Sequence, residues 1–351
     1  MKDKTTSPSG LTSAQYSGKE NWELEGAIDK YMKQLVALIR RKYLSSPTCS
    51  RPMDLGQKTQ FLTLDVISYI GFGQSFGDLE ADADANGYIH ASRQGLGIVV
   101  ATCALGIYPI LQWPPLARLI GPSEKEKSGL GKMMATARGI VNARLEKPTD
   151  QRTDMLASFM RHGLTKDELF TEAFLQIIAG SDTTATAIRA TMLYIISHPQ
   201  VYLRLREEID GAVAAGIAPE DIVPDAVAKD LPYLQAVLRE GVRIHPPASN
   251  IGLKRVPKGG DSVIVDGRVI YLPGGTNVGV SVFGMNRRKD IFGEDVDLFR
   301  PERWLPVEKG DEERIETMRR TTELIWGHGR YQCLGKNIAW MEYNKAVFEV
   351  C

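Results

Sequence analysis

The stretch from residue 326 to residue 335 reads Trp-Gly-His-Gly-Arg-Tyr-Gln-Cys-Leu-Gly and places a thiol, Cys333, on a glycine-rich loop. Its three glycines allow backbone conformations and close approaches that other residues exclude. A helical pattern opens directly afterwards at Lys336, and a helix N-terminus stabilises a thiolate. Two interpretations are open: an axial thiolate ligand for a haem iron, or a buried structural cysteine in a helix-capping turn.

A second motif, Glu240-Gly241-Val242-Arg243, lies in a stretch with helical apolar periodicity, residues 231–244. Residues i and i+3 share a helix face, so Glu240 and Arg243 can form an ion pair. Taken alone, such a pair is most simply a surface salt bridge worth under ~1 kcal/mol. A further arginine, Arg303, follows in the sequence Phe-Arg-Pro-Glu-Arg-Trp at 299–304.

A third motif, Ala179-Gly180-Ser181-Asp182-Thr183-Thr184, occupies the middle of a helix predicted over residues 165–197. Thr165 and Glu168 form a capping-box pattern at the start of this helix. Glycine and threonine are poor helix formers, and hydroxyls that bond to the helix carbonyls are typical of kinks. Taken alone, the motif is explained by a kinked core helix.

Together, the three motifs in this order resemble the cytochrome P450 family. The loop matches the family's haem-thiolate loop at Gly327, Gly329, Cys333 and Gly335, with Trp326 in place of the usual Phe. Tyr331 stands where the family has the arginine or histidine that binds a haem propionate, and Arg330 lies one position earlier.

The resemblance implies a mainly α fold with a smaller β portion (α+β), and haem b held by the Cys333 thiolate. It implies that Asp182 and Thr183 relay protons during oxygen activation. It also implies a buried triad supporting the cysteine loop, formed by Glu240, Arg243 and Arg303. The implied haem contacts are Gly327, Gly329, Arg330, Tyr331, Gly335, Ala179 and Gly180. The implied substrate-pocket residues are Phe174, Ile178, Ser249, Asn250 and Ile251.

The activity implied by the resemblance is insertion of one oxygen atom from O2 into a hydrophobic small molecule. Electrons would come from an NADPH-cytochrome P450 reductase, with candidate contacts at Arg239, Arg330, Lys336 and Lys345. Residues 299–304 and 329–336 are similar to the pisatin-demethylase-like group of fungal secondary metabolism. Two other functions are open: a catalytically inactive fragment, and a haem-thiolate enzyme that rearranges peroxides without a reductase. The intact Asp182-Thr183 pair argues against the second of these.

Compared with typical family members, the chain is expected to be truncated at both ends, without the N-terminal anchor and sheet or the C-terminal strands. Residues 1–20 are polar and are expected to form a flexible start. Residues 21–351 are expected to form a single partial cytochrome P450 domain.

Composition narrows the class of protein. The 351 residues hold 43 basic and 43 acidic side chains, so no charge excess indicates nucleic acid as a partner. The four cysteines are scattered and predict no disulfide framework, which suits a reducing compartment.

The hydrophobic pattern predicts helices first and strands later. A hairpin with its turn at Asp266-Gly267 is predicted in a β-rich stretch at 251–282, and a charged irregular stretch is expected at 301–322. Besides the helices at 165–197 and 231–244, further helices are predicted at 22–44, 57–70, 125–145, 199–215 and 224–228.

Residues 94–117 carry no formal charge and are long enough to span a bilayer. Glycines and prolines interrupt them, so a core helix followed by an apolar loop is expected instead. The resemblance places the loop that caps the substrate channel here, which implies peripheral membrane contact, with Trp113 suited to an interface. The family resides at the endoplasmic reticulum membrane; this chain, without an anchor, is expected in the cytoplasm or peripherally on the membrane.

Overall fold

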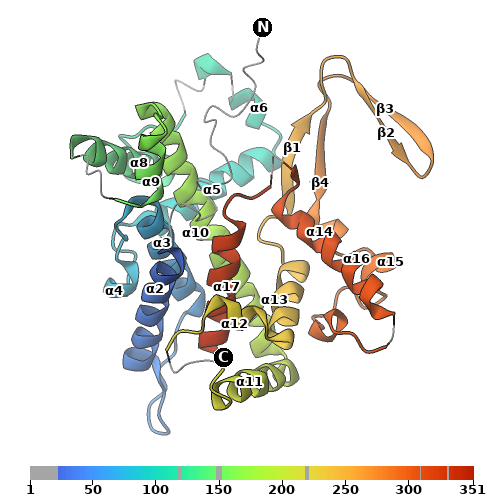
Figure 1. Ribbon diagram of the computed structural model, residues 1–351. Coiled ribbons are helices and arrows are strands. Elements are labelled where there is room, and N and C mark those ends of the chain that lie inside the picture. The colour runs from blue at the N-terminus through green and yellow to red at the C-terminus, as the bar shows by residue number, and fades with distance from the viewer. Residues whose placement is uncertain are drawn as a thin grey trace. The chain divides into compact units, whose positions relative to one another are not determined.

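Helices carry most of the chain, and the named strands fall between residues 250 and 281 in the part that the structure describes (Figure 1). The computed structural model describes residues 23–111, 113–116, 121–147, 152–217, 221–308, 310–329 and 332–351. The predicted mainly α fold with a smaller β portion is confirmed. The predicted flexible start at 1–20 lies outside the described residues.

The described chain divides into two compact units. The first takes in residues 23–189, 221–225 and 334–350, and the second takes in 190–217, 226–333 and Cys351. The expectation of one partial domain at 21–351 stays a prediction.

The helices predicted in the first unit at 22–44, 57–70, 125–145 and 165–197 each coincide with helical structure, whereas the short helices at Asp78–Ala81, Tyr108–Leu111 and Met155–Arg161 were not predicted. The helix α10 runs unbroken from Lys166 to Ser197, and only its last eight residues belong to the second unit. The other helices are α2 (Leu24–Leu38), a π-helical turn η1 (Ile39–Tyr43), α3 (Leu55–Phe72), α4 (Asp78–Ala81), α5 (Tyr88–Ala104), α6 (Tyr108–Leu111), α8 (Gly129–Glu146), α9 (Met155–Arg161) and α17 (Lys336–Val350).

The second unit combines short helices with two small antiparallel sheets. Its helices are α11 (Pro199–Ala214), α12 (Asp225–Lys229, shared at its first residue), α13 (Pro232–Ile244), α14 (Val282–Met285), α15 (Lys289–Phe292), a 3₁₀ turn η2 (Pro301–Trp304), α16 (Asp311–Glu323) and a 3₁₀ turn η3 (Leu324–Trp326). Its strands are β1 (Asn250–Arg255), β2 (Asp261–Val265), β3 (Arg268–Leu272) and β4 (Asn277–Ser281).

Side-chain caps fix where several helices begin. Asp54 accepts a hydrogen bond from the Gln57 N–H at the start of α3 (2.9 Å), as expected of an N-cap aspartate. The capping box predicted for α10 is present: Thr165 N–H donates to Glu168 (2.8 Å), and Glu168 N–H lies 3.4 Å from the Thr165 hydroxyl. These local contacts explain why the start of α10 could be predicted from sequence.

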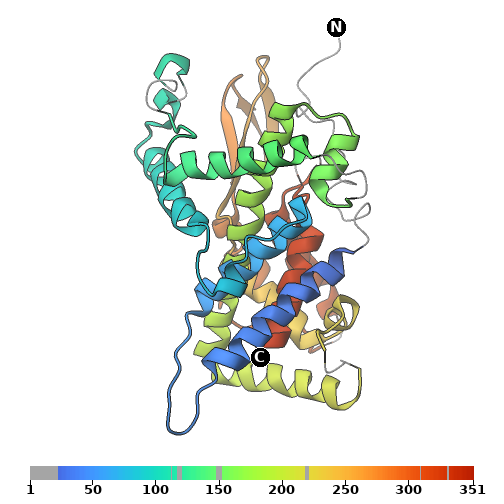
Figure 2. The ribbon, with the colours of Figure 1, turned by 90° about the vertical axis from the view of Figure 1, so that its left-hand side faces the viewer.

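The core of the first unit forms around α3, which packs against α2 while α2 also packs against α17. Most residues of α3 are buried, including the polar Gln60 and Thr63. Also in this unit, α5 packs against α8, as the 90° view of the chain in Figure 2 shows. A helix buried on nearly every face needs polar partners for its polar side chains, and Gln60 and Thr63 of α3 find theirs on α10.

Lys345 on α17 ties together distant parts of the first unit. Its side chain is fully buried and its Nζ donates to Glu25 (2.8 Å) and to the Val223 carbonyl (2.6 Å), and lies 2.7 Å from Asp29. The candidate reductase contact at Lys345 is therefore wrong, because this ammonium is enclosed by α2 and residue 223.

The two sheets each contain two strands. β1 pairs with β4, and β2 pairs with β3 through the predicted turn at Asp266 and Gly267, whose φ angles are 49° and 75°. Positive φ at both central residues is the conformation that Asp-Gly favours in a tight hairpin. The hairpin exposes apolar side chains, among them Ile264 (75%) and Val269 (71%).

Two expectations need correction. The stretch at 301–322 is not irregular, because it contains η2 and most of α16. The helix α16 has few apolar residues. It is stabilised instead by acidic residues in its first turn, which interact favourably with the helix dipole, and by the pairing of Glu316 with Arg320 at i+4. Its periodicity was hidden because the buried face is short: Ile315, Met318 and Thr322.

The apolar stretch at 94–117 is not a core helix, contrary to expectation. Of its residues on α5 only Gly95 is buried, and the stretch exposes Ile98, Val100, Leu105, Ile110 and Trp113 by at least 60%. Among the described residues, no helix combines the length and apolar character that crossing a membrane requires.

Candidate functional site

The motif on α10 presents two different faces. Ala179 and Thr183, one helical turn apart, are exposed, and Leu175 one turn earlier is 53% exposed. The Thr183 hydroxyl donates to the Ala179 carbonyl at 2.7 Å. Such a bond satisfies the hydroxyl within its own helix and competes for the carbonyl of the helix ladder. The helix nevertheless continues without interruption to Ser197.

Gly180 and Asp182 are turned toward other helices of the same unit. A Cβ built on Gly180 would lie 2.6 Å from Ile67 Cγ1 of α3, so close packing alone requires a glycine here. The Asp182 carboxylate accepts hydrogen bonds from Gln60 of α3 and Ser92 of α5, each at 2.7 Å. Neither contact was foreseen from sequence.

Glu240, Arg243 and Arg303 lie in direct contact within the second unit. Arg243 donates to both Glu240 oxygens at 2.8 Å, and Arg303 Nε donates to one of them at 2.9 Å. Trp304 Nε1 donates to the other oxygen at 2.9 Å, a contact that sequence reasoning missed. The two ion pairs have no exposed side-chain surface, so the surface salt-bridge interpretation of the Glu240–Arg243 pair is wrong.

The two guanidinium groups also bind main-chain carbonyls of the segment that follows β4. Arg243 donates to the carbonyls of Asn286 and Val296, and Arg303 donates to that of Phe292 (2.6 Å). Planar guanidinium groups with several N–H donors suit such a task better than lysine would. The cluster therefore fixes the path of residues 286–298.

The cysteine loop has a defined local geometry on both sides of its undescribed centre. Gly327 and Gly329 have positive φ angles of 75° and 59°, which glycine adopts without strain. The Cys333 N–H donates to the Trp326 carbonyl at 2.6 Å and closes the loop. Cys333 is exposed, so the interpretation as a buried structural cysteine is wrong. The predicted haem contacts Arg330 and Tyr331 lie outside the described residues.

The helix α17 begins at Lys336, three residues after the cysteine, as its sequence pattern predicted. A Cβ built on Gly335 would meet nothing within 4 Å. At this position the loop leaves open space beside its backbone, which suits the close approach of a flat group.

The predicted substrate-pocket residues are described only in part. Phe174 and Ile178 are half-buried on α10, and the Phe174 ring stacks on Phe170 with centroids 6.0 Å apart. Ser249 is exposed, and its carbonyl accepts the N–H of Val282 at 3.0 Å. The side chains of Asn250 and Ile251 lie outside the described part.

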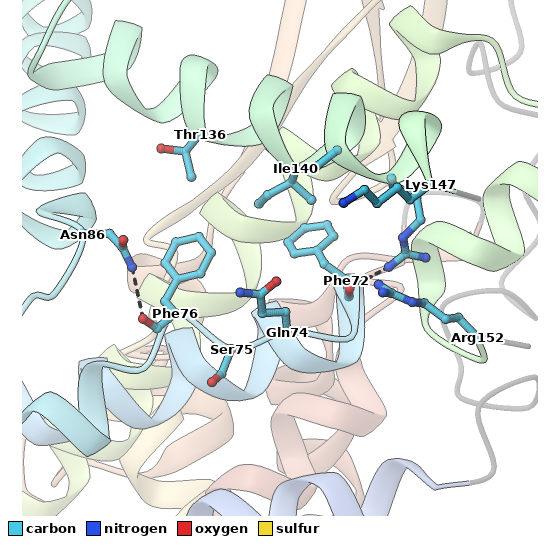
Figure 3. A pocket seen from close by; sticks show the side chains of 11 residues that line it. Phe72, Gln74, Ser75, Phe76, Asn86, Thr136, Ile140, Lys147 and Arg152 are labelled. Carbon is cyan, nitrogen blue, oxygen red and sulfur yellow. Dashed lines mark hydrogen bonds between the residues drawn. The ribbon is translucent and has the colours of Figure 1, made fainter. Parts of the chain in front are cut away.

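A cavity of about 600 Å³ in the first unit contains none of the predicted site residues (Figure 3). Arg144 at its wall is buried, pairs with Asp154 and donates to the Phe72 carbonyl at 2.6 Å. No motif indicated this cavity, because its lining comes from separate segments: Phe72, Gln74, Ser75, Phe76, Asn86, Thr136, Ile140, Ala143, Arg144, Lys147 and Arg152.

Comparison with known proteins decides the family. A sequence model of the family described as cytochrome P450 matches residues 6–350. The chain belongs to the cytochrome P450 family. This P450 is 43% identical over 339 residues to cytochrome P450 monooxygenase ABA1 of Pyricularia oryzae, covering 95% of this chain and 65% of that protein.

Two further relatives are also P450 monooxygenases by name. Cytochrome P450 monooxygenase aba1 of Botryotinia fuckeliana is 36% identical over 343 residues, which cover 97% of this chain and 66% of the relative. Cytochrome P450 monooxygenase ACRTS1 of Alternaria alternata is 31% identical over 335 residues, which cover 93% of this chain and 86% of the relative. The P450 chain described here thus spans about 65% of the length of its Pyricularia relative. The predicted family is confirmed, and the pisatin-demethylase-like subgroup stays a prediction.

Proposed function

We propose that this P450 is a haem-thiolate monooxygenase that inserts one oxygen atom from O2 into a hydrophobic small molecule of fungal secondary metabolism. The observation that carries the proposal is the exposed Cys333 thiol on a glycine loop closed by the Cys333 N–H to Trp326 bond. The donor set fits haem, since a single thiolate beside a glycine-rich backbone would supply a ligand for the iron and room for a flat group. The three named relatives, which are P450 monooxygenases, support the same reaction class.

In this proposal Cys333 would hold the haem iron. Bound haem b supplies oxygen activation, which thiolate ligation favours. Gly327, Gly329 and Gly335 let the backbone approach the cofactor, and Arg330 or Tyr331 binds a propionate. Ala179 and Gly180 of α10 are further cofactor contacts in this proposal; Ala179 is exposed, whereas packing against Ile67 is sufficient to explain Gly180.

The remaining residues supply protons, support and substrate contacts. Asp182 and Thr183 pass protons, and Thr183 lies on the exposed face of α10. Glu240, Arg243 and Arg303 hold the segment at 286–298 through main-chain carbonyls. The substrate contacts are Phe174, Ile178, Ser249, Asn250 and Ile251. Electrons come from an NADPH-cytochrome P450 reductase, for which Arg239, Arg330 and Lys336 remain candidate contacts.

The deciding experiment is a reduced, carbon-monoxide-bound difference spectrum of the haem-reconstituted chain. The long-wavelength Soret band of thiolate-ligated haem is expected, and Cys333→Ala should abolish it. Cys103→Ala is the matched control, because Cys103 is also an exposed thiol, and it should keep the band. Failure to bind haem, or a short-wavelength band in the unsubstituted chain, would overturn the proposal.

We also propose that the apolar surface at residues 94–117 contacts the membrane periphery. Ile98, Val100 and Trp113 expose apolar area at one end of α5 and just after it, and tryptophan favours the membrane interface. Co-sedimentation with phosphatidylcholine vesicles tests this. The double substitution Ile98→Ser with Trp113→Ser should weaken binding, and unchanged binding would contradict the proposal.

A further inference from the structure

The Asp182 carboxylate is held on both oxygens by donors from two different helices. Gln60 Nε2 of α3 donates to Oδ1 at 2.7 Å, and Ser92 Oγ of α5 donates to Oδ2 at 2.7 Å. Both donor residues are almost fully buried, with exposures of 2% for Gln60 and 1% for Ser92. Short hydrogen bonds to an ionised acceptor are among the stronger ones in proteins. The carboxylate is therefore fixed toward α3 and α5.

This orientation separates Asp182 from the hydroxyl next to it in sequence. Thr183 donates its one hydroxyl proton to the Ala179 carbonyl at 2.7 Å, so it does not donate to Asp182. The neighbouring residues on a helix point about 100° apart, and Thr183 is exposed whereas Asp182 is half-buried. With one hydrogen bond on each oxygen, the Asp182 carboxylate is turned toward α3 and α5 and not toward the Thr183 hydroxyl.

The two donors differ in what they can transfer. A serine hydroxyl can give its proton to an acceptor while its oxygen accepts a second proton from another donor. The serine therefore ends the transfer uncharged. The amide N–H of Gln60 can hold a carboxylate but is a very weak acid. Ser92 is therefore the donor suited to proton transfer, and Gln60 is suited only to orientation.

Tyr88 of α5 adds a second buried hydroxyl that interacts electrostatically with Asp182. It lies one helical turn before Ser92 on α5, is 1% exposed, and its hydroxyl has no hydrogen-bond partner among the described residues. Burial raises the pKa of the Tyr88 phenol and the charge of Asp182 raises it further. A protonated hydroxyl without a partner thus lies within the electrostatic reach of the Asp182 carboxylate.

We propose that Gln60 and Ser92 are positioning residues that hold the Asp182 carboxylate toward α3 and α5, and that Ser92 gives its hydroxyl proton to Asp182 while the Ser92 oxygen takes a proton from water. The inference deepens the proposed function, on which it rests, because it needs Asp182 to supply protons in oxygen activation. It assigns a role to α3 and α5, which contribute none of the motif residues.

The contact itself is tested without turnover. Urea midpoints of the haem-free chain are compared for Asp182→Asn, Ser92→Ala and the double variant, and again with Gln60→Leu. The double variants should lose clearly less than the sum of the single losses. Additive losses would show that the side chains do not interact and would overturn the inference.

The role in proton supply is tested on the haem-loaded chain with NADPH and a P450 reductase, by following dioxygen consumption without added substrate. Each dioxygen reduced to two waters takes up four electrons and four protons, so slow proton supply slows its consumption. Ser92→Ala should slow it about tenfold, equivalent to ~1.4 kcal/mol, and Ser92→Thr should restore it. Ser68→Ala removes another buried hydroxyl of the same unit and should leave the rate unchanged.

The outcomes separate the two proposals. If Asp182→Asn slows consumption while Ser92→Ala and Gln60→Leu do not, the positioning role is overturned and the proposed function stands. If Asp182→Asn consumes dioxygen at the unsubstituted rate, Asp182 supplies no protons, and the proposed relay fails together with this inference. If Ser92→Ala slows dioxygen consumption but Ser92→Thr does not restore it, the role of the Ser92 hydroxyl is also overturned.

Discussion

Single residues in this P450 show how much a buried charge depends on its partners. Glu240 accepts hydrogen bonds from Arg243, Arg303, Trp304 and the Arg300 N–H, and its side chain has no exposed surface. A buried carboxylate is tolerated only when it is paired and hydrogen-bonded. Two guanidinium groups depend on it in turn.

Glu240→Gln should lower the free energy of unfolding by roughly 3–5 kcal/mol, because it removes the buried charge that both guanidinium groups share and leaves Arg303 with the half-buried Asp295 instead. Urea denaturation of the haem-free chain measures the change. Glu316→Gln on α16 is the matched control, since Glu316 pairs with Arg320 at a 43% exposed side chain and should cost under ~1 kcal/mol. Equal losses in the two variants would contradict the argument.

A second residue, Asp78, makes stability depend on pH. Burial raises the pKa of Asp78 from 3.8 to about 7; the charges of Asp65 and Asp84 add to this, and the hydrogen bond from the Ala85 N–H partly offsets it. The folded chain therefore keeps a proton that the unfolded chain releases near its ordinary pKa. Because the folded state binds more protons in this range, its stability falls as pH rises from about 4 to about 7.

Asp78→Asn should remove this contribution. The variant should gain stability relative to the unsubstituted chain as the pH rises, with the gain levelling off above about pH 7. Urea midpoints across this range provide the measurement, and Asp210→Asn, at an exposed position on α11, should show no such gain. A constant difference between the Asp78→Asn variant and the parent at every pH would refute the assignment.

At the scale of elements, the middle of α10 packs closely against α3 of the first unit. Thr63 of α3 donates to the Ser181 carbonyl at 2.8 Å, and Gly180 meets Ile67 of the same helix. The motif that resembles an oxygen-activation groove is thus also a helix-packing site. Packing against α3 and the proposed oxygen activation use different faces of α10, since Thr183 stays exposed.

Gly180→Ala should destabilise the chain by roughly 1–3 kcal/mol, since the new methyl group would overlap Ile67. Gly139→Ala on α8 is the opposite case, because a Cβ there meets nothing within 4 Å. It should stabilise the chain by roughly 0.5–1 kcal/mol through helix propensity. Thermal unfolding of both variants checks the signs, and destabilisation by both would show that packing against α3 is not the cause.

At the scale of the whole chain, contacts between residues far apart in sequence decide what could be predicted. The capping box of α10 and the Asp266-Gly267 turn were predictable because their chemistry is local. The partners of Asp182 were not, since they lie 122 and 90 positions away. Lys345 was expected at the surface because it is charged. It is buried, and its ammonium donates to Glu25, 320 positions away.

Lys345→Met should lower the free energy of unfolding by roughly 1–3 kcal/mol, because the buried Val223 carbonyl loses its donor and two carboxylates lose their cation. The control is Lys289→Met, whose ammonium pairs with Glu294 at the surface and should change stability by under ~0.5 kcal/mol. Urea denaturation monitored by helical circular dichroism compares the two. A loss no larger than that of the control would mean that Lys345 does not tie α17 to α2.

The β2–β3 hairpin has a consequence for how the protein behaves in concentrated solution. It is a two-stranded sheet, and Ile264, Val269 and Tyr271 on it are each more than 60% exposed. Exposed apolar strands with unpaired edges are templates for strand addition between molecules. Purified chain should therefore self-associate as concentration rises. A lysine on the hairpin at Ile264 would act as a gatekeeper and extend the range over which the protein stays monodisperse.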